Sequence, residues 1–74
     1  MMNEVALRKI IGTNLQKARK AKRLTQKDVA QRVGLTANYY ATLEQGVTIG
    51  SIETIYKIID VLETKATDIF PDNY

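Results

Sequence analysis

Apolar residues recur at intervals of three and four positions through most of this chain, which is the period of an amphipathic α-helix. The first such stretch follows Asn3, whose side chain suits a helix N-cap. Its apolar face is formed by Leu7, Ile11, Leu15 and Ala18. Gly12 lies inside this pattern, and an interior Gly costs about 1 kcal/mol relative to Ala. The pattern therefore predicts one long first helix, with a bend or a frayed start before Gly12.

Residues 25–46 read as two short helices joined by a tight turn. Thr25 and Thr36 each stand where an N-cap is needed, and Asp28 suits the positive end of the first helix. Gly34 and Gly46 follow the two helices, where glycine tolerates the left-handed backbone that ends a helix. The inward stripes are Val29, Ala30 and Val33 on the first helix and Tyr40 and Leu43 on the second. A helix, a glycine turn and a second helix at this spacing describe a helix-turn-helix.

A fourth helix is predicted after Ser51, and a short fifth helix from Thr67, which Pro71 ends. The core stripe of the fourth helix is predicted to be Ile52, Ile55, Ile59 and Leu62. On the same helical wheel, Ile58 and Val61 project off the edge of this stripe toward solvent. The chain is therefore predicted to be an all-α, compact bundle of about five helices. Its 74 residues allow a single domain, 1–74.

The amino-acid composition excludes several classes of functional site but adds little about the fold. The chain has no Cys and no His, so it lacks thiolates, disulfides, the commonest general base and the commonest metal ligand. We therefore expect no enzyme activity, no metal and no cofactor. No apolar run approaches the roughly 20 residues of a membrane span, and the N-terminus lacks the features of a secretory signal. We expect a soluble, cytoplasmic protein without a membrane partner.

The net charge of +3 is divided unevenly along the chain. Residues 1–35 carry nine Lys and Arg against two acids, whereas residues 36–74 carry two Lys against six acids. This asymmetry suits a polyanion on one side of the molecule, although a basic helix face that is merely solvated explains the charge about as well.

Residues 12–70 resemble the helix-turn-helix domain of phage repressors, Cro proteins and restriction–modification controller proteins, the lambda-repressor-like or xenobiotic-response-element-like family. The spacing of five residues carries most of the resemblance: Gln26, Ala30, Gly34, Glu44 and Gly46. Further matches are Leu15, Arg19, Leu24, Thr25, Val29, Val33, Tyr40, Leu43, Ser51, Ile52, Thr54 and Ile55. Residues 1–11 form an N-terminal extension that the resemblance does not explain.

The resemblance implies a regulator of transcription, a repressor or autoregulator, that binds a palindrome in double-stranded DNA as a homodimer. The second helix of the motif would enter the major groove. The positions that match base-reading residues are Ala37, Asn38 and Thr42, with Tyr39 at the flank. Asn38 is suited to a bidentate contact with adenine, and Ala37 and the Thr42 methyl to a thymine methyl. Candidate contacts to the DNA backbone are Gln26, Lys27, Thr36, Lys22, Arg23 and Gln45.

Two of these residues have structural alternatives that the sequence leaves open. Gln26 either clamps a phosphate or braces the recognition helix. Tyr39 either contacts the sugar-phosphate backbone or shields the turn as a half-buried side chain. Arg19 and Glu44 match a buried ion pair of the family, and we interpret them as structural rather than as DNA contacts.

The C-terminal helices, residues 51–70, are predicted to form the dimer interface through Ile58, Val61, Phe70 and Tyr74. One departure from the family pattern favours another function. Residues 47–50 hold no cation, although the family often places Lys or Arg after the glycine at position 46. The alternative is an antitoxin-like module on the same fold that mainly binds another protein, so an unknown protein partner stays open.

Overall fold

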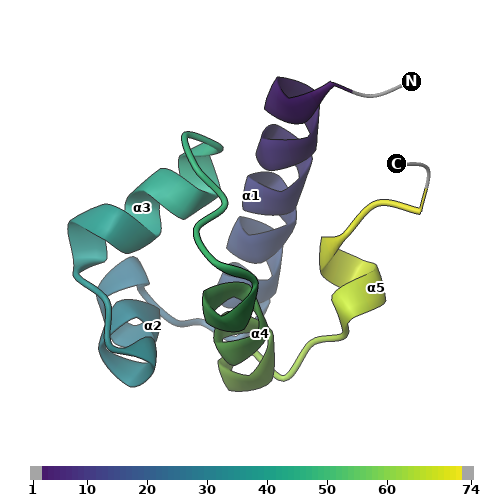
Figure 1. Cartoon of the computed structure of the whole chain (residues 1–74). Helices are drawn as coiled ribbons and strands as arrows, with labels where there is room; N and C mark the ends of the chain where they lie inside the picture. Colours follow the sequence, from purple (N-terminus) through teal and green to yellow (C-terminus); the bar gives the residue numbers. More distant parts are fainter. Residues whose placement is uncertain (1–2, 73–74) are drawn as a thin grey trace.

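The computed structural model describes residues 3–72 and consists of five α-helices in this part of the chain (Figure 1). In order they are α1 (Glu4–Ala21), α2 (Gln26–Val33), α3 (Ala37–Gln45), α4 (Ile52–Val61) and α5 (Ala66–Ile69). The prediction of an all-α bundle of about five helices is confirmed. The last helix, predicted from Thr67 through Phe70, is shifted by one residue at each end and spans Ala66–Ile69.

Four helices begin at the residues predicted from their capping side chains. Each side-chain oxygen accepts a hydrogen bond from the backbone N–H three residues later, at 2.8 to 3.1 Å. The four capping residues are Asn3, Thr25, Thr36 and Ser51. At α2 the Asp28 carboxylate also accepts from the Thr25 N–H at 2.9 Å, which completes a capping box and fixes the start of this helix.

Left-handed backbone follows four of the helices. Gly34 and Gly46 end α2 and α3 with φ of 75° and 78°, as predicted. Arg23 and Glu63, after α1 and α4, also have positive φ, of 58° and 53°. The sequence did not predict these two, because a side chain in this conformation is held by the surrounding fold rather than by its own preference.

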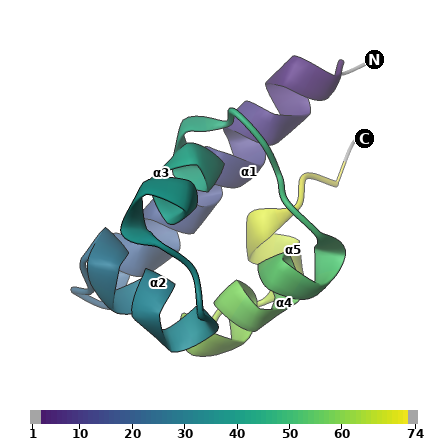
Figure 2. The same cartoon turned by 60° about the vertical axis from the view of Figure 1, so that its left-hand side comes forward.

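The expectation of a bend or frayed start near Gly12 is wrong, because α1 runs unbroken from Glu4 to Ala21. Gly12 is buried where α1 passes behind α3 (Figure 2). A Cβ atom at this position would lie 2.4 Å from the carbonyl oxygen of Glu44 and 2.6 Å from that of Leu43. The glycine therefore lets the backbones of α1 and α3 approach each other closely.

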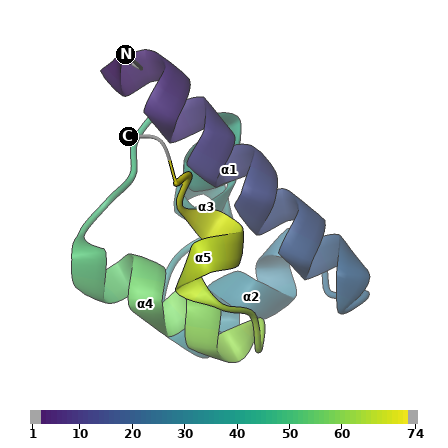
Figure 3. The ribbon, with the colours of Figure 1, turned by 90° about the vertical axis from the view of Figure 1, so that its right-hand side faces the viewer.

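The hydrophobic core lies where the helices meet, and α5 packs against α1 and α4 (Figure 3). Its buried residues are Ile11, Leu15, Val29, Ala30, Tyr40, Leu43, Ile55, Ile58, Ile59, Leu62 and Ile69. Most were predicted from helical spacing. Leu7, Ala18, Leu24, Val33 and Leu35 are partly buried against this cluster.

Two residues of α4 have exchanged the environments that the sequence predicted. Ile58 was expected to face solvent at a dimer interface, but it is 0% exposed and belongs to the core. Ile52 was expected in the core and is 68% exposed. The physical reason is that α4 packs on both α2 and α5, so its buried arc is wide enough to include Ile58. In the first turn of α4, Ile52 and Glu53 are both exposed.

Candidate nucleic-acid interface

The outer face of α3 carries the predicted base-reading residues. Asn38 and Tyr39 are exposed, whereas Ala37 and Thr42 are partly exposed. The Thr42 hydroxyl donates a hydrogen bond to the Tyr39 carbonyl oxygen at 2.6 Å. The hydroxyl proton of Thr42 is used inside the helix. The group that Thr42 can offer to a ligand is therefore its methyl group. The amide of Asn38 makes no such internal bond among the described residues and has both its donor and acceptor free.

The inner face of α3 is held by the Arg19–Glu44 pair that the family resemblance implied. The Arg19 Nε donates to Glu44 Oε2 at 2.7 Å and its Nη2 donates to Oε1 at 3.1 Å. A third bond runs from Nη1 to the Leu24 carbonyl oxygen at 2.9 Å. Both residues are buried, so this bidentate pair fixes the position of α3 against α1 and the loop before α2.

Gln26 joins the same carboxylate. Its Nε2 donates to Glu44 Oε1 at 3.0 Å, which supports the alternative that Gln26 braces the recognition helix. A phosphate contact would have to use the second N–H of this amide or the backbone at the start of α2. Burial by itself raises the pKa of the Glu44 carboxyl, but hydrogen bonds from Arg19 and Gln26 outweigh it, so this pKa lies below its ordinary value. Glu44 is therefore charged at neutral pH.

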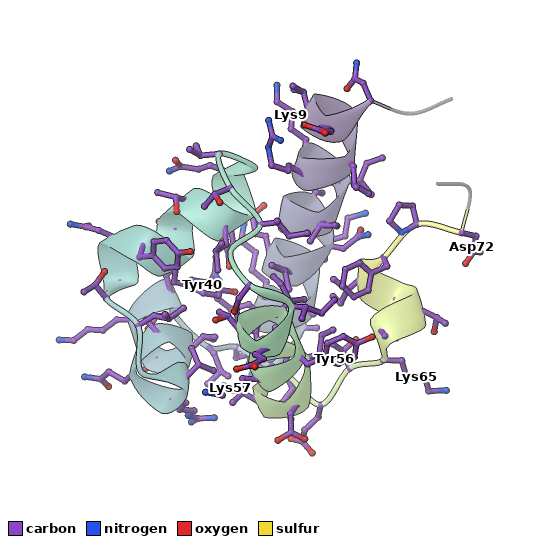
Figure 4. The ribbon with its side chains drawn as sticks, in the orientation of Figure 1. Lys9, Tyr40, Tyr56, Lys57, Lys65 and Asp72 are labelled. Carbon is purple, nitrogen blue, oxygen red and sulfur yellow. The ribbon has the colours of Figure 1, made fainter. Side chains whose placement is uncertain are left out.

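Tyr40 fills the space beside this pair and points into the core (Figure 4). Burial raises the pKa of its hydroxyl, and the nearby Glu44 carboxylate acts in the same direction. The hydroxyl oxygen lies beside the Glu44 carboxylate and the Arg19 guanidinium, but within residues 3–72 it makes no hydrogen bond of normal geometry. Tyr40 is therefore a neutral packing residue, in agreement with its predicted place on the inward stripe.

The candidate cations before α3 fall into two groups. Arg23 and Lys27 are exposed near the start of α2, and no ion pair within the described residues uses them. Lys22 is different, because its ammonium group is paired with the Glu63 carboxylate after α4. A phosphate would compete with Glu63 for Lys22, so Lys22 is the weaker candidate. Thr36 uses its hydroxyl as the cap of α3, and Gln45 is exposed at the other end of this helix.

Tyr39 lies against the loop between α3 and α4. A Cβ atom on Gly50 would be 3.0 Å from the Tyr39 hydroxyl oxygen, so the glycine leaves room for the ring. This position favours the shielding role of Tyr39 over a contact to the sugar-phosphate backbone, the two alternatives that the sequence left open. In the same loop Val47 is 65% exposed, and residues 47–50 present no cation to this flank.

The predicted dimer surface is changed by the exchange of Ile52 and Ile58. Val61 and Phe70 are partly buried, and Tyr74 lies outside the described residues. Tyr56, which the sequence analysis did not select, is half-exposed on α4 and projects toward α5 (Figure 4). Its ring centroid is 6.1 Å from that of Phe70. The sequence feature that could have identified Tyr56 is its spacing from Ile52, because the two residues lie one helical turn apart on the outer side of α4.

Among the described residues, no helix is both long enough and apolar enough to cross a membrane.

Residues 15–69 match a family model described as Helix-turn-helix. A protein of Sinorhizobium fredii, described as the uncharacterized HTH-type transcriptional regulator y4dJ, is 34% identical over 56 residues, which cover 76% of this chain and 73% of that protein. The crystal structure of the clp gene regulator ClgR from Corynebacterium glutamicum matches with a TM-score of 0.83 and 25% identity, covering 90% of this chain and 71% of that chain. The chain therefore belongs to the phage-repressor and Cro type of helix-turn-helix family, a family of DNA-binding transcriptional regulators.

Proposed function

We propose that this protein is a repressor or autoregulator that binds a palindromic operator as a homodimer, with α3 in the major groove. The observation that carries the proposal is the division of α3 into two faces. Its inner face is fixed by Tyr40, Leu43 and the buried Glu44, and its outer face presents free polar and small side chains. A helix held rigidly from behind is suited to place side chains against base edges. A cytoplasmic location and a non-enzymatic role belong to this proposal.

The contacts divide into those that read sequence and those that position the protein. Asn38 would bond an adenine edge through its amide, while Ala37 and the Thr42 methyl would contact thymine methyl groups. Lys27 and Arg23 would neutralise phosphates, with help from Lys22 when it leaves Glu63. Further backbone contacts would come from Gln26, Thr36 and Gln45.

The homodimer would form through the outer surface of α4 and α5. Ile52 and Tyr56 lie one turn apart there, and the tilted rings of Tyr56 and Phe70 have their centroids 6.1 Å apart. Val61 is about 140° from Tyr56 around α4, on the other edge of its buried arc, and would lie outside this interface. A single module of this size buries too little surface on DNA for tight specific binding, and two copies related by a two-fold axis overcome this limit. The axis would place the two copies of α3 about 34 Å apart, one turn of DNA.

DNA selection tests the base-reading part of the proposal. Duplexes selected from a random pool should share a palindromic site, and the parent protein should bind it more tightly as salt is lowered. Asn38→Ala should weaken binding to this site by about 1–3 kcal/mol for each half-site and leave binding to scrambled DNA nearly unchanged. Lys27→Ala, the matched variant, should weaken both DNAs alike. Failure of the parent to bind any duplex would refute the proposal, and equal losses for Asn38→Ala on both DNAs would remove Asn38 from base reading.

Sedimentation tests the homodimer. The parent should sediment as a dimer at tens of micromolar, and Ile52→Glu should give monomers because it places like charges across the axis. Since Ile52 is exposed, this variant should keep the fold of the protomer. Gln31→Glu, which adds the same charge at an exposed residue of α2, should stay dimeric. A parent that sediments as a monomer of 8.3 kDa would refute this part of the proposal.

A protein-interaction module of the antitoxin type is the second candidate, and the flank after α3 favours it. Val47 and Ile52 are both exposed there, and the connecting loop has no cation. Such a module would bind DNA weakly or not at all, whereas the proposed regulator should show a steep salt dependence. The salt titration described above therefore separates the two functions.

A further inference from the structure

We propose that Lys9, in the N-terminal part of α1, supplies the phosphate contact on the flank of α3 where the following loop has no cation. The inference rests on the proposed DNA binding and adds to it a residue outside the helix-turn-helix motif. Lys9 precedes the residues that match the family model, 15–69, so neither the motif nor the family assigns it a role. Its assignment comes from its place in the fold.

Lys9 lies directly against the end of the recognition helix. A Cβ atom on Gly46 would be 2.9 Å from both the Cα and the Cγ of Lys9, and 3.1 Å from its backbone nitrogen. No side chain therefore separates Lys9 from the last turn of α3. Figure 4 shows Lys9 near the N-terminal end of α1, on the side of the end of α3. Gly46 sits between Gln45, a proposed backbone contact, and the exposed Val47.

The ammonium group of Lys9 is available for an anion. Lys9 is exposed, and the ion pairs within residues 3–72 use Arg8, Arg19 and Lys22 but not Lys9. The nearest acid in sequence, Glu4, faces Arg8 at 3.9 Å. Lys9 also borders an open groove of about 300 Å³ on α1, whose other lining residues are Ile10, Thr13, Asn14 and Lys17. The groove lies on the side of α1 where Asn14 donates a hydrogen bond to the carbonyl oxygen of Ile69 at the end of α5, and its lining holds a second lysine and no carboxylate.

The flank of α3 needs such a contact. A strand of DNA that passes Gln45 would next meet residues 47–50, which offer it apolar and hydroxyl side chains only. A lysine on a flexible four-carbon stem can reach a phosphate from a neighbouring element as well as from the loop itself. We infer that the phosphate contact of this flank has moved from the loop after α3 to α1, and that the ligand is the phosphate backbone of the bound duplex.

The test is a comparison of variants that remove one charge at two places. Lys9→Met keeps the aliphatic stem that packs on Gly46, and Lys65→Met removes the same charge from the residue before α5, far from α3 in Figure 4. Binding of each variant to the selected operator and to scrambled DNA is measured over a range of salt concentrations. Because the proposed homodimer carries each substitution twice, loss of this phosphate contact from both protomers lowers the magnitude of the salt slope by about 1.8 and the affinity about thirtyfold at about 0.15 M salt. We expect this loss for Lys9→Met on both DNAs, and parent behaviour for Lys65→Met and Lys9→Arg.

The outcomes separate this inference from the proposed function. If Lys9→Met keeps the salt slope of the parent while Lys27→Ala lowers it, the inference is overturned and the regulator stands. If Lys65→Met loses as much as Lys9→Met, the effect is one of net charge and the inference is again overturned. If the parent binds no duplex, the proposed function fails first and the inference fails with it. Melting temperatures show whether each variant is folded. Lys9→Gln removes the same charge with a polar side chain, and it should lower the salt slope as Lys9→Met does.

Discussion

Substitution of Gly12 by Ala is a sensitive test of the packing between α1 and α3, because two physical effects predict opposite signs. Helix propensity alone predicts that Ala in the middle of α1 stabilises the protein by about 1 kcal/mol. The structure predicts the reverse, since the added Cβ atom would lie 2.4 Å from the Glu44 carbonyl oxygen and 2.6 Å from that of Leu43. The sign of the change therefore decides between them.

The magnitude follows from what would have to move. Overpacking of a well-packed core costs about 1–3 kcal/mol, and a change near the upper end is expected when the obstructing atoms are backbone. Here both carbonyl oxygens belong to α3, so relief requires the two helices to separate. After subtraction of the helix-propensity gain, we expect a net loss of about 2 kcal/mol in the free energy of unfolding. For a domain of this size, that corresponds to a fall in Tm of roughly 8–16 °C.

The assay is thermal and urea denaturation followed by circular dichroism, with Thr13→Ala as the matched control. Thr13 is the next residue of α1 and is exposed, so its replacement gains helix propensity without a clash. We expect Thr13→Ala to melt at or above the parent temperature. A Gly12→Ala protein that also melts at or above the parent temperature would refute the close approach of α1 and α3.

Three further predictions concern the buried cluster behind α3. Arg19→Ala strands the Glu44 carboxylate and should lower the free energy of unfolding by about 3–5 kcal/mol, whereas Arg19→Met combined with Glu44→Leu should recover most of it in the same denaturation assay. Because the pKa of Glu44 is lowered by folding, its contribution is fully present above the ordinary value of 4.5 and is lost as pH falls through the lowered pKa. The free energy of unfolding of Glu44→Gln should therefore fall less than that of the parent as the pH is lowered through this range, measured by urea denaturation at a series of pH values. Tyr40→Phe removes a buried hydroxyl that has no partner, so stability should be unchanged or should rise by up to about 1 kcal/mol, and a loss above 1 kcal/mol would show that the hydroxyl is satisfied.

The features that the sequence predicted well are those that depend on neighbouring residues. An N-cap such as Thr25 or Ser51 needs only a side-chain oxygen and the amide three residues on, and both were placed correctly. Gly34 needs only its own backbone freedom to end α2. Helical spacing likewise identified Tyr40 and Leu43 as the inner face of α3.

The features that the sequence did not predict depend on the arrangement of helices in space. Whether Ile58 or Ile52 is buried is decided by where α2 and α5 lie around α4, and the periodicity of α4 alone does not contain that information. The role of Gly12 is decided by the backbone of α3, about thirty residues away in sequence. The contact of Lys9 with Gly46 is of the same kind, and no motif includes both residues.

The division of α3 into an inner and an outer face has a consequence for how this protein can change its target. Stability rests on the inner residues, whereas Ala37, Asn38 and Thr42 take no part in the buried cluster. Exposed substitutions away from such clusters usually alter stability by less than about 0.5 kcal/mol. Tyr39 is excluded from this freedom because its hydroxyl lies close to Gly50. If these three positions read bases as proposed, they can be exchanged together, and new operator preferences would be reached through variants that remain folded.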